Sequence, residues 1–263
     1  MDDLELARNY IFRKMHHIRG YLVPVDALAI AEVIIGQKNA RMNGGIAEIG
    51  VFFGRSFLLM ASLIGKQERA LAADLFDIGQ DSGGKDSLQL ASFLSSANKL
   101  GIQIDRQAIF VGDSRKLDGS SELQQASPLR FVSIDGSHEL DLVASDADLA
   151  SRTITEFGVI CFDDFCNPEF PEVTLGVFDF LRSAHERFVP FAITQKKLFV
   201  CKREYHDFYS SLVAHSELLR RIERKSISMN GVPVLLLRQS FMERARYEVL
   251  ARSGFGGLNN LFY

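Results

Sequence analysis

The chain has 263 residues, of which 47% are hydrophobic and 24% charged, an ordinary composition for a globular protein with a sizeable core. A formal net charge of −3 and a pI near 6.1 give no reason to expect nucleic acid as a partner, and no apolar run is long enough to span a membrane. The acidic N-terminus lacks the apolar segment of a secretory signal, and the three cysteines form neither a metal-ligand spacing nor an even disulfide set. We therefore expect a reduced, cytoplasmic protein.

The first 43 residues have a helical pattern. Residues 4–17 form one amphipathic stretch, Gly20 and Pro24 interrupt it, and residues 25–35 form a second, more apolar stretch that Asp26 could cap. Helices placed before the first strand must pack on the sheet or cover its ligand-binding edge, so we expect an N-terminal helical cap over residues 1–43.

The next segment predicts a strand, a glycine turn and a helix. Residues 46–49 are a short apolar run, and the apolar residues from Ser56 onward recur at helical spacing. Between them lie Gly50 and Gly54, which allow a tight turn and a close approach by a ligand, with Glu48 just before them. The N–H groups at the start of the helix would point at that ligand. This arrangement is typical of a nucleotide-type site, although a purely structural turn has the same pattern.

Four further apolar runs follow, at residues 70–73, 108–111, 131–134 and 158–162, and predicted helices separate them. Continuous apolar strands that alternate with helices indicate a parallel sheet covered on both faces, and ligands bind at the carboxyl ends of such strands. These ends carry acidic or polar side chains: Asp74, Asp113 with Ser114, Asp135 with His138, and Asp163 with Asp164. Acidic residues at five consecutive strand ends indicate a site.

The last third of the chain predicts a helix at 173–185, antiparallel strands at 188–194 and 198–201, and a helix at 204–224. Asn230-Gly231, between two apolar runs, is a strong signal for a hairpin. A helix at 241–252 ends the predicted elements. We expect a doubly wound α/β fold with a mostly parallel seven-stranded sheet, an antiparallel C-terminal hairpin and N-terminal helices. Residues 44–202 form the predicted core, and residues 203–263 pack on it.

The sequence of the turn at residues 50–54 distinguishes between two candidate cofactors. A dinucleotide oxidoreductase would carry Gly-x-Gly-x-x-Gly, but here Phe52 takes the place of the middle glycine. Glu48 would also place a carboxylate beside phosphates. Both departures disfavour NAD and suit S-adenosylmethionine, which carries a positive charge and an amino group.

Five motifs together resemble the class I S-adenosylmethionine-dependent methyltransferases, and within them the metal-dependent small-molecule O-methyltransferases of the macrolide-sugar type. The motifs are Glu48-x-Gly50-x-x-x-Gly54-Arg55-Ser56, Asp74, Gly112-Asp113-Ser114, Ile134-Asp135-Gly136-Ser137-His138 and Phe162-Asp163-Asp164. The resemblance covers roughly residues 44–201. The pairing of Ile-Asp-Gly-x-His with the later Asp-Asp is its most specific part.

The resemblance implies a role for each matching residue. Glu48, Gly50, Gly54 and Ser56 would line the methionine end of the cofactor. Asp74 would bind the ribose hydroxyls, and Asp113 and Ser114 would flank the adenine. Asp135, Asp163 and Asp164 would hold a divalent cation, and such an all-oxygen set suits Mg²⁺ better than Zn²⁺. Because neighbours on a strand point to opposite faces, Asp163 and Asp164 can share a cation only if the chain has already turned there.

His138, three residues after Asp135, is the candidate general base. Its alternative roles are to cap the helix or to hydrogen-bond to a ligand carboxylate. We expect O-methylation of a hydroxyl on a sugar or another small metabolite, with Asp135 and His138 as catalytic residues. A non-catalytic cofactor-binding module is the alternative, and an NAD-dependent oxidoreductase ranks third. The expected partner is a small molecule rather than nucleic acid or a membrane, and a homo-oligomer is possible.

Overall fold

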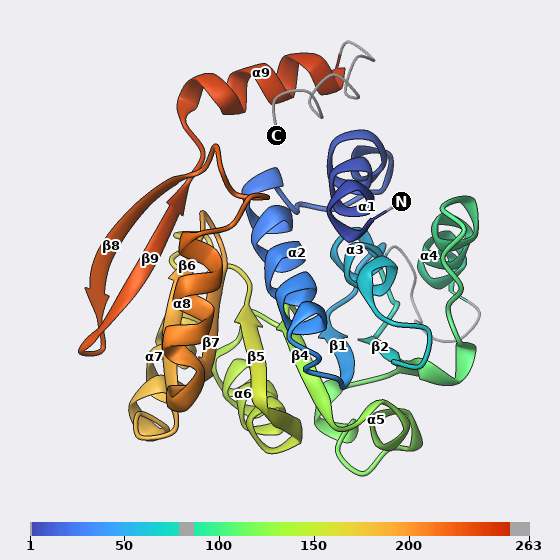
Figure 1. Ribbon diagram of the computed structural model, residues 1–263. Helices are drawn as coiled ribbons and strands as arrows, with labels where there is room; N and C mark the ends of the chain where they lie inside the picture. Colours follow the sequence, from blue (N-terminus) through green and yellow to red (C-terminus); the bar gives the residue numbers. More distant parts are fainter. Residues whose placement is uncertain (1, 79–86, 253–263) are drawn as a thin grey trace.

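The computed structural model describes residues 2–78 and 87–252. It has nine strands in a single sheet, in the order β3-β2-β1-β4-β5-β7-β6-β9-β8 (Figure 1). The first five strands are parallel to one another: β1 (Gly45–Ile49), β2 (Ala70–Asp74), β3 (Ile109–Val111), β4 (Leu129–Ile134) and β5 (Ile154–Phe162). The order reverses between β1 and β4, which is where a doubly wound sheet opens a crevice at the carboxyl ends of its strands.

The remaining strands extend the sheet beyond the predicted seven. Strand β7 (Leu198–Lys202) runs antiparallel to both β5 and β6 (Phe188–Ile193). The hairpin of β8 (Glu223–Met229) and β9 (Val232–Arg238) turns at Asn230-Gly231, as predicted. It joins the same sheet because β9 pairs with β6 in parallel. The predicted α/β class, with a mostly parallel sheet, is confirmed.

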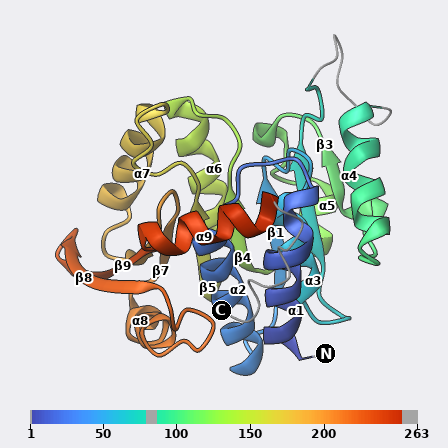
Figure 2. The ribbon, with the colours of Figure 1, turned by 90° about the horizontal axis from the view of Figure 1, so that it is seen from above.

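Helices cover both faces of the sheet and bury two apolar clusters (Figure 2). One face carries α1 (Asp3–Asn9), α2 (Pro24–Asn39), α3 (Arg55–Leu63) and α8 (His206–Ala214). The other carries α5 (Ser121–Ala126), α6 (Leu140–Thr153) and α7 (Pro171–Ser183). Helix α4 (Leu88–Lys99) joins the first cluster, where the Phe93 ring packs edge-on against Phe57 at 5.6 Å.

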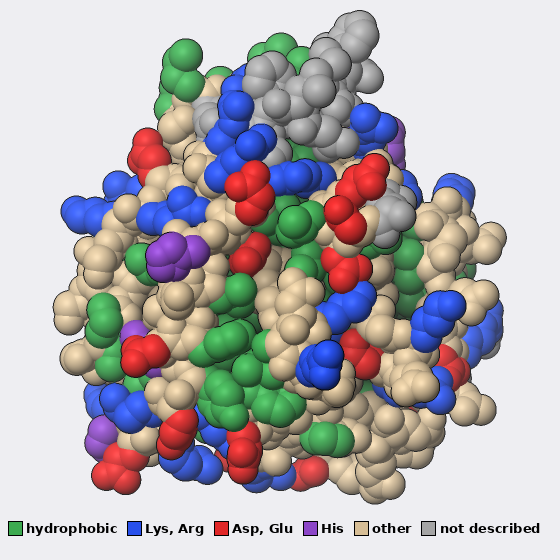
Figure 3. Space-filling model, in the orientation of Figure 1, with side chains coloured by type: hydrophobic (Ala, Val, Ile, Leu, Met, Phe, Trp, Pro, Cys, Tyr) green, Lys and Arg blue, Asp and Glu red, His purple; other side chains and the backbone are tan. Residues whose placement is uncertain are grey.

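Helix α9 (Phe241–Arg252) passes above α2 in both ribbon views, and its Tyr247 ring lies 6.3 Å from that of Phe12 (Figures 1 and 2). The predicted loop at residues 79–86 and the tail after residue 252 lie outside the described residues. Among the described residues, no helix is both long and apolar enough to cross a membrane. On the face in Figure 3, lysine and arginine side chains are interspersed with aspartate and glutamate.

Three predicted helix boundaries are wrong. Helix α1 ends at Asn9, and a π-helical turn and a 3-10 turn continue the chain to His17. Helix α2 begins at Pro24 with Val23 as its N-cap, so Asp26 does not cap it and is instead buried in its first turn. Helix α8 ends at Ala214 rather than near 224, because Arg224 belongs to β8 and donates to the carbonyls of Val213 and Ser216.

Candidate active site

A cavity of about 810 Å³ opens at the carboxyl ends of the parallel strands. This is within the usual size range of small-molecule sites, roughly 300–1,000 Å³. Its wall carries every site residue predicted from the sequence except Glu48 and Gly54: Gly50, Ser56, Asp74, Asp113, Ser114, Asp135, His138, Asp163 and Asp164. The topology therefore brings together residues that lie more than a hundred positions apart in the sequence.

Glu48 lies beneath the cavity, where its side chain is fully buried. Its Oε1 accepts a 2.6 Å hydrogen bond from the hydroxyl of Ser56, which does reach the cavity wall. Burial raises the pKa of Glu48 to about 7. The predicted direct contact of Glu48 with a cofactor is therefore absent from this arrangement, and Glu48 instead supports Ser56.

Neighbouring protein atoms leave no space for a side chain at the two glycines of this turn. Gly50 has φ +87°, and a Cβ there would lie 1.9 Å from the carbonyl oxygen of Asp135. Gly54, with φ +88°, is the N-cap of α3, and its Cβ would meet the Phe93 ring at 2.4 Å. Both distances are impossible for a side chain. The glycines thus allow β1, β4 and α4 to approach closely, rather than clearing space for a ligand directly.

Asp74, at the end of β2, fixes the turn that forms one wall. Its two oxygens accept from the backbone N–H groups of Phe52, at 2.8 Å, and Phe76, at 2.7 Å. Burial raises the pKa of Asp74 although these hydrogen bonds oppose the shift. The Asp74 carboxylate also lines the cavity.

Asp113 and Ser114 lie at the outer part of the cavity. Asp113 caps a short 3-10 turn and pairs with Arg115, whose hydrogen bonds lower the pKa of Asp113 to about 2. Ser114 hydrogen-bonds to Asp146, a buried carboxyl on α6 whose pKa burial raises to about 6. Asp113 is therefore a helix cap as well as a wall residue, and Asp146 orients Ser114.

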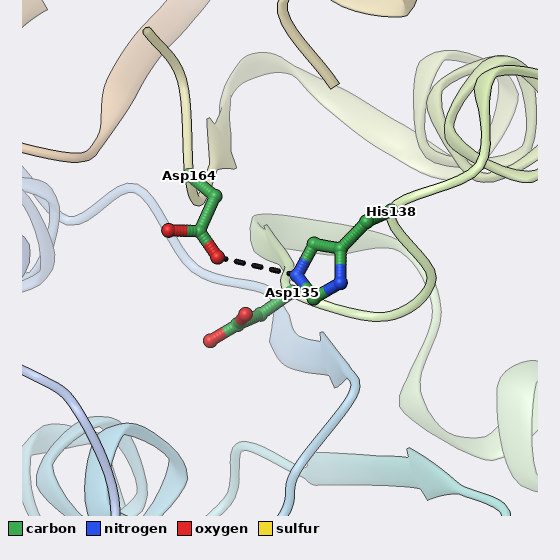
Figure 4. Close-up of side chains that lie close together, drawn as sticks. All are labelled: Asp135, His138 and Asp164. Atoms are coloured by element: carbon green, nitrogen blue, oxygen red, sulfur yellow. Dashed lines mark hydrogen bonds and ion pairs between the residues drawn. The ribbon is translucent and has the colours of Figure 1, made fainter. Parts of the chain in front are cut away.

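Three side chains from two strand ends meet at the inner part of the cavity (Figure 4). Asp135, His138 and Asp164 each offer a ligand atom, and these atoms all lie within 4.8 Å of one another. Nε2 of His138 is 3.2 Å from Oδ2 of Asp164, and the imidazole stacks on the Phe170 ring at 3.6 Å and 7°. Asp164 has φ +51°, so the chain has turned by this residue, as the sharing of a cation requires.

The pKa values of Asp135 and Asp164 are strongly shifted from their usual range. Burial, reinforced by the charge of Asp163, raises the pKa of Asp135 well above its usual range. For Asp164, burial acts in the same direction, but hydrogen bonds from His138 and Asn167 lower its pKa to about 2. Perturbed carboxyl groups within one cavity are typical of functional sites.

Asp163 is not one of these three residues, although its side chain hydrogen-bonds to Asp135. Its Oδ1 is 2.9 Å from Nζ of Lys197, whose side chain is only 2% exposed. Lys197 and the half-buried Arg55 both line the cavity, and the sequence analysis assigned neither to the site. The antiparallel pairing of β5 with β7 matches Phe162 with Leu198 and so places Asp163 beside Lys197, but the predicted hairpin of residues 188–194 and 198–201 does not include that pairing. Arg55 had no comparable signal.

Comparison with known proteins agrees with this architecture. Residues 47–165 match the family model of a methyltransferase domain. This match agrees with the resemblance to the class I S-adenosylmethionine-dependent methyltransferases that the motifs carry.

Two solved structures show the same fold. The O-methyltransferase NovP is 11% identical, with a TM-score of 0.56 over 76% of this chain and 99% of that chain. CalS11, a TDP-rhamnose 3'-O-methyltransferase, is 16% identical, with a TM-score of 0.51 over 66% of this chain and 78% of that chain. A search of curated proteins found no significant match.

Proposed function

We propose that this protein transfers a methyl group from S-adenosylmethionine to a hydroxyl of a small molecule. The observation that carries the proposal is the cavity, where the acidic strand ends and His138 meet at the switch point of a methyltransferase domain. NovP and CalS11, which share the fold, are O-methyltransferases, and the substrate in the printed name of CalS11 is a sugar nucleotide. We infer a sugar or another hydroxylated metabolite as the acceptor.

In this proposal the cofactor lies along β1, β2 and β3. Gly50 and Ser56 take its methionine end, and the Asp74 carboxylate accepts from the ribose hydroxyls. Asp113 and Ser114 flank the adenine. The support is that all five line one continuous cavity. Glu48 and Gly54 then act indirectly, through Ser56 and through the shape of the turn.

His138 is the proposed general base. The hydroxyl oxygen of the acceptor forms a bond to the methyl carbon while the carbon–sulfur bond breaks, and the electron pair stays on sulfur. The hydroxyl proton passes to the imidazole. With Nε2–H donating to Asp164, Nδ1 is the free acceptor, and stacking on Phe170 fixes the ring. Asp135, whose carboxyl oxygen lies within 4.8 Å of the imidazole nitrogen, is the second proposed catalytic residue.

Asp135, His138 and Asp164 have donor atoms close enough together to hold a divalent cation. In that arrangement His138 would be a ligand rather than the general base, so the two roles are alternatives for this side chain. When bound, a cation such as Mg²⁺ lowers the pKa of the acceptor hydroxyl. The predicted set of Asp135, Asp163 and Asp164 differs from this group in one member, because Asp163 pairs with Lys197. Cytoplasmic location, a homo-oligomeric state, and the absence of nucleic-acid and membrane partners stay predictions.

Calorimetric titration with S-adenosylmethionine tests the proposal. We expect binding by the wild type and a loss of about ten-fold in affinity for Asp74→Asn, which removes one charge-assisted acceptor. Asp148→Asn on the exposed surface of α6 is the matched control, since its side chain is 66% exposed. No binding by the wild type would refute the proposal. Binding without methyl transfer to any hydroxylated acceptor would favour the non-catalytic module.

A further inference from the structure

Lys197 is a buried lysine in the floor of the cavity. Its side chain is 2% exposed, although lysine is rarely buried without a partner. Its backbone is held on both sides by Thr194: the Lys197 N–H donates to Oγ1 of Thr194 at 3.1 Å, and its carbonyl accepts from the Thr194 N–H at 2.9 Å. These bonds fix the backbone of Lys197 just before β7, and the ion pair with Asp163 holds its ammonium group.

Carboxyl groups surround this ammonium. Asp163 forms the ion pair, and Asp135, Asp26 and Glu48 also interact with Lys197 electrostatically. Nζ of Lys197 lies 2.9 Å from Oδ1 of Asp163, so the ammonium group forms a buried ion pair. A permanent positive charge therefore lies beside the residues proposed to hold a cation.

The ion pair also determines which carboxylates remain available. Asp163 and Asp164 are adjacent in sequence, but they have different partners. Oδ1 of Asp163 pairs with Lys197 and the Asp163 side chain also hydrogen-bonds to Asp135, while Asp164 pairs with His138. Because Lys197 engages Asp163, only Asp135 and Asp164 remain as carboxylates of the donor group that also contains His138. The affinity of a site for hard cations such as Mg²⁺ rises with the number of charged oxygen ligands, so the loss of one carboxylate lowers that affinity.

We propose that the ammonium group of Lys197 acts as a fixed positive charge in the active site. By pairing with Asp163, it keeps this carboxylate from coordinating a divalent ion and so weakens the binding of that ion. This proposal rests on the proposed function. Lys197 is a positioning residue in this account. Its ammonium supplies locally part of the positive charge that a tightly bound metal would supply. The acidic end of the cavity is then partly neutralised before any cofactor or ion enters.

The test is a cation titration of the full chain without cofactor, with Mn²⁺ followed by the EPR signal of the free ion and Mg²⁺ by calorimetry. We expect Lys197→Met to bind both ions at least about ten-fold more tightly than the wild type, a typical size for a change beside a metal site. Lys202→Met is the matched control, because it removes the same charge at the opposite end of β7 and should leave the affinity unchanged.

Lys197→Met leaves the charge of Asp163 buried without its partner, which destabilises the fold, so a second variant that removes both charges is needed as a control. In Lys197→Met/Asp163→Asn both charges are removed, and we expect the cation affinity of the wild type within about three-fold, because Asp163 is not a ligand. An unchanged affinity in Lys197→Met would overturn the proposal. So would a loss of about ten-fold or more in the double variant, which would show Asp163 to be a ligand.

The same samples are then titrated with S-adenosylmethionine. Failure of the wild type to bind it counts against the proposed function, whereas the proposal for Lys197 stands or falls on the cation titration alone. The two failures are therefore separable.

Discussion

At the scale of single residues, the site is defined by which carboxyl groups keep a proton and which do not. Burial raises the pKa of Glu48 to about 7, whereas hydrogen bonds lower that of Asp164 to about 2. Both lie at strand ends of the same sheet. Near neutral pH one is close to half protonated and the other is fully charged, so two side chains of similar chemistry carry out different tasks.

Glu48 should make the stability of the protein depend on pH. Its pKa is about 7 in the folded protein and 4.5 without the burial that folding imposes, so the folded chain holds an extra proton between these values. The wild type should therefore lose stability as pH rises through this window, by at most about 1.4 kcal/mol per pH unit. Glu48→Gln has no such proton and still accepts from Ser56, so its free energy of unfolding should depend less on pH.

Urea unfolding of both proteins at pH 5 and pH 7.5 measures the difference. We expect the variant to gain about 1–3 kcal/mol on the wild type between the two conditions. A difference that is independent of pH would show that Glu48 is already ionised at pH 5.

At the scale of elements, the turn between β1 and α3 depends on two glycines that pack against other parts of the sheet. Gly54 combines a left-handed φ of +88° with a Cβ position only 2.4 Å from the ring of Phe93. Gly119 has a similar φ of +76°, but a Cβ there would meet nothing within 4 Å. Comparing an alanine substitution at Gly54 with one at Gly119 therefore separates the cost of backbone strain from the cost of a steric clash.

We expect Gly54→Ala to destabilise the protein by about 2–4 kcal/mol, because strain and overpacking add. Gly119→Ala should cost only the backbone strain, about 1 kcal/mol. Urea denaturation midpoints give both values. Equal losses in the two variants would mean that Phe93 moves aside freely, and that the close approach of α4 is not what requires a glycine at position 54.

Most elements were predictable because their signals are local. The apolar runs of β1 to β5 and the Asn230-Gly231 turn lie in the sequence itself, and the parallel order then brings Asp74, Asp113 and Asp135 to one edge. Pro24 was interpreted as an interruption before the stretch at residues 25–35, but proline is favoured in the first turn of a helix, and α2 begins at Pro24. The partner of Asp163 depends on the register of β5 against β7, which no local pattern in the sequence specifies.

The roles of Asp163 and Asp164 could not be read from sequence for a different reason. Alternation along a strand would send them to opposite faces, but Asp164 adopts a left-handed backbone conformation that turns it toward His138. Such a conformation is rare outside glycine and depends on the surrounding contacts, here Asn167 and Lys196.

At the scale of the whole molecule, the site and the main stabilising network occupy opposite ends of the sheet. Arg130, near the start of β4, is fully buried, and its guanidinium bonds to Glu68 at 2.6 and 3.0 Å and to Oε1 of Gln37 at 2.8 Å. Gln37 in turn donates to the hydroxyl of Tyr209 on α8. This network links β4, α2, α8 and the segment before β2, while Asp135 follows the other end of β4.

Arg130→Met should therefore separate stability from function. The change leaves the carboxylate of Glu68 and the amide of Gln37 without their buried partner, so the free energy of unfolding should fall by about 3–5 kcal/mol. Adding Glu68→Gln removes the orphaned charge and should recover part of that loss. Below its denaturation midpoint, each variant should bind S-adenosylmethionine with the affinity of the wild type, because no ligand-facing residue has moved. Urea unfolding and calorimetry on the same samples measure both quantities, and a parallel loss of affinity would mean that the two ends of β4 are coupled.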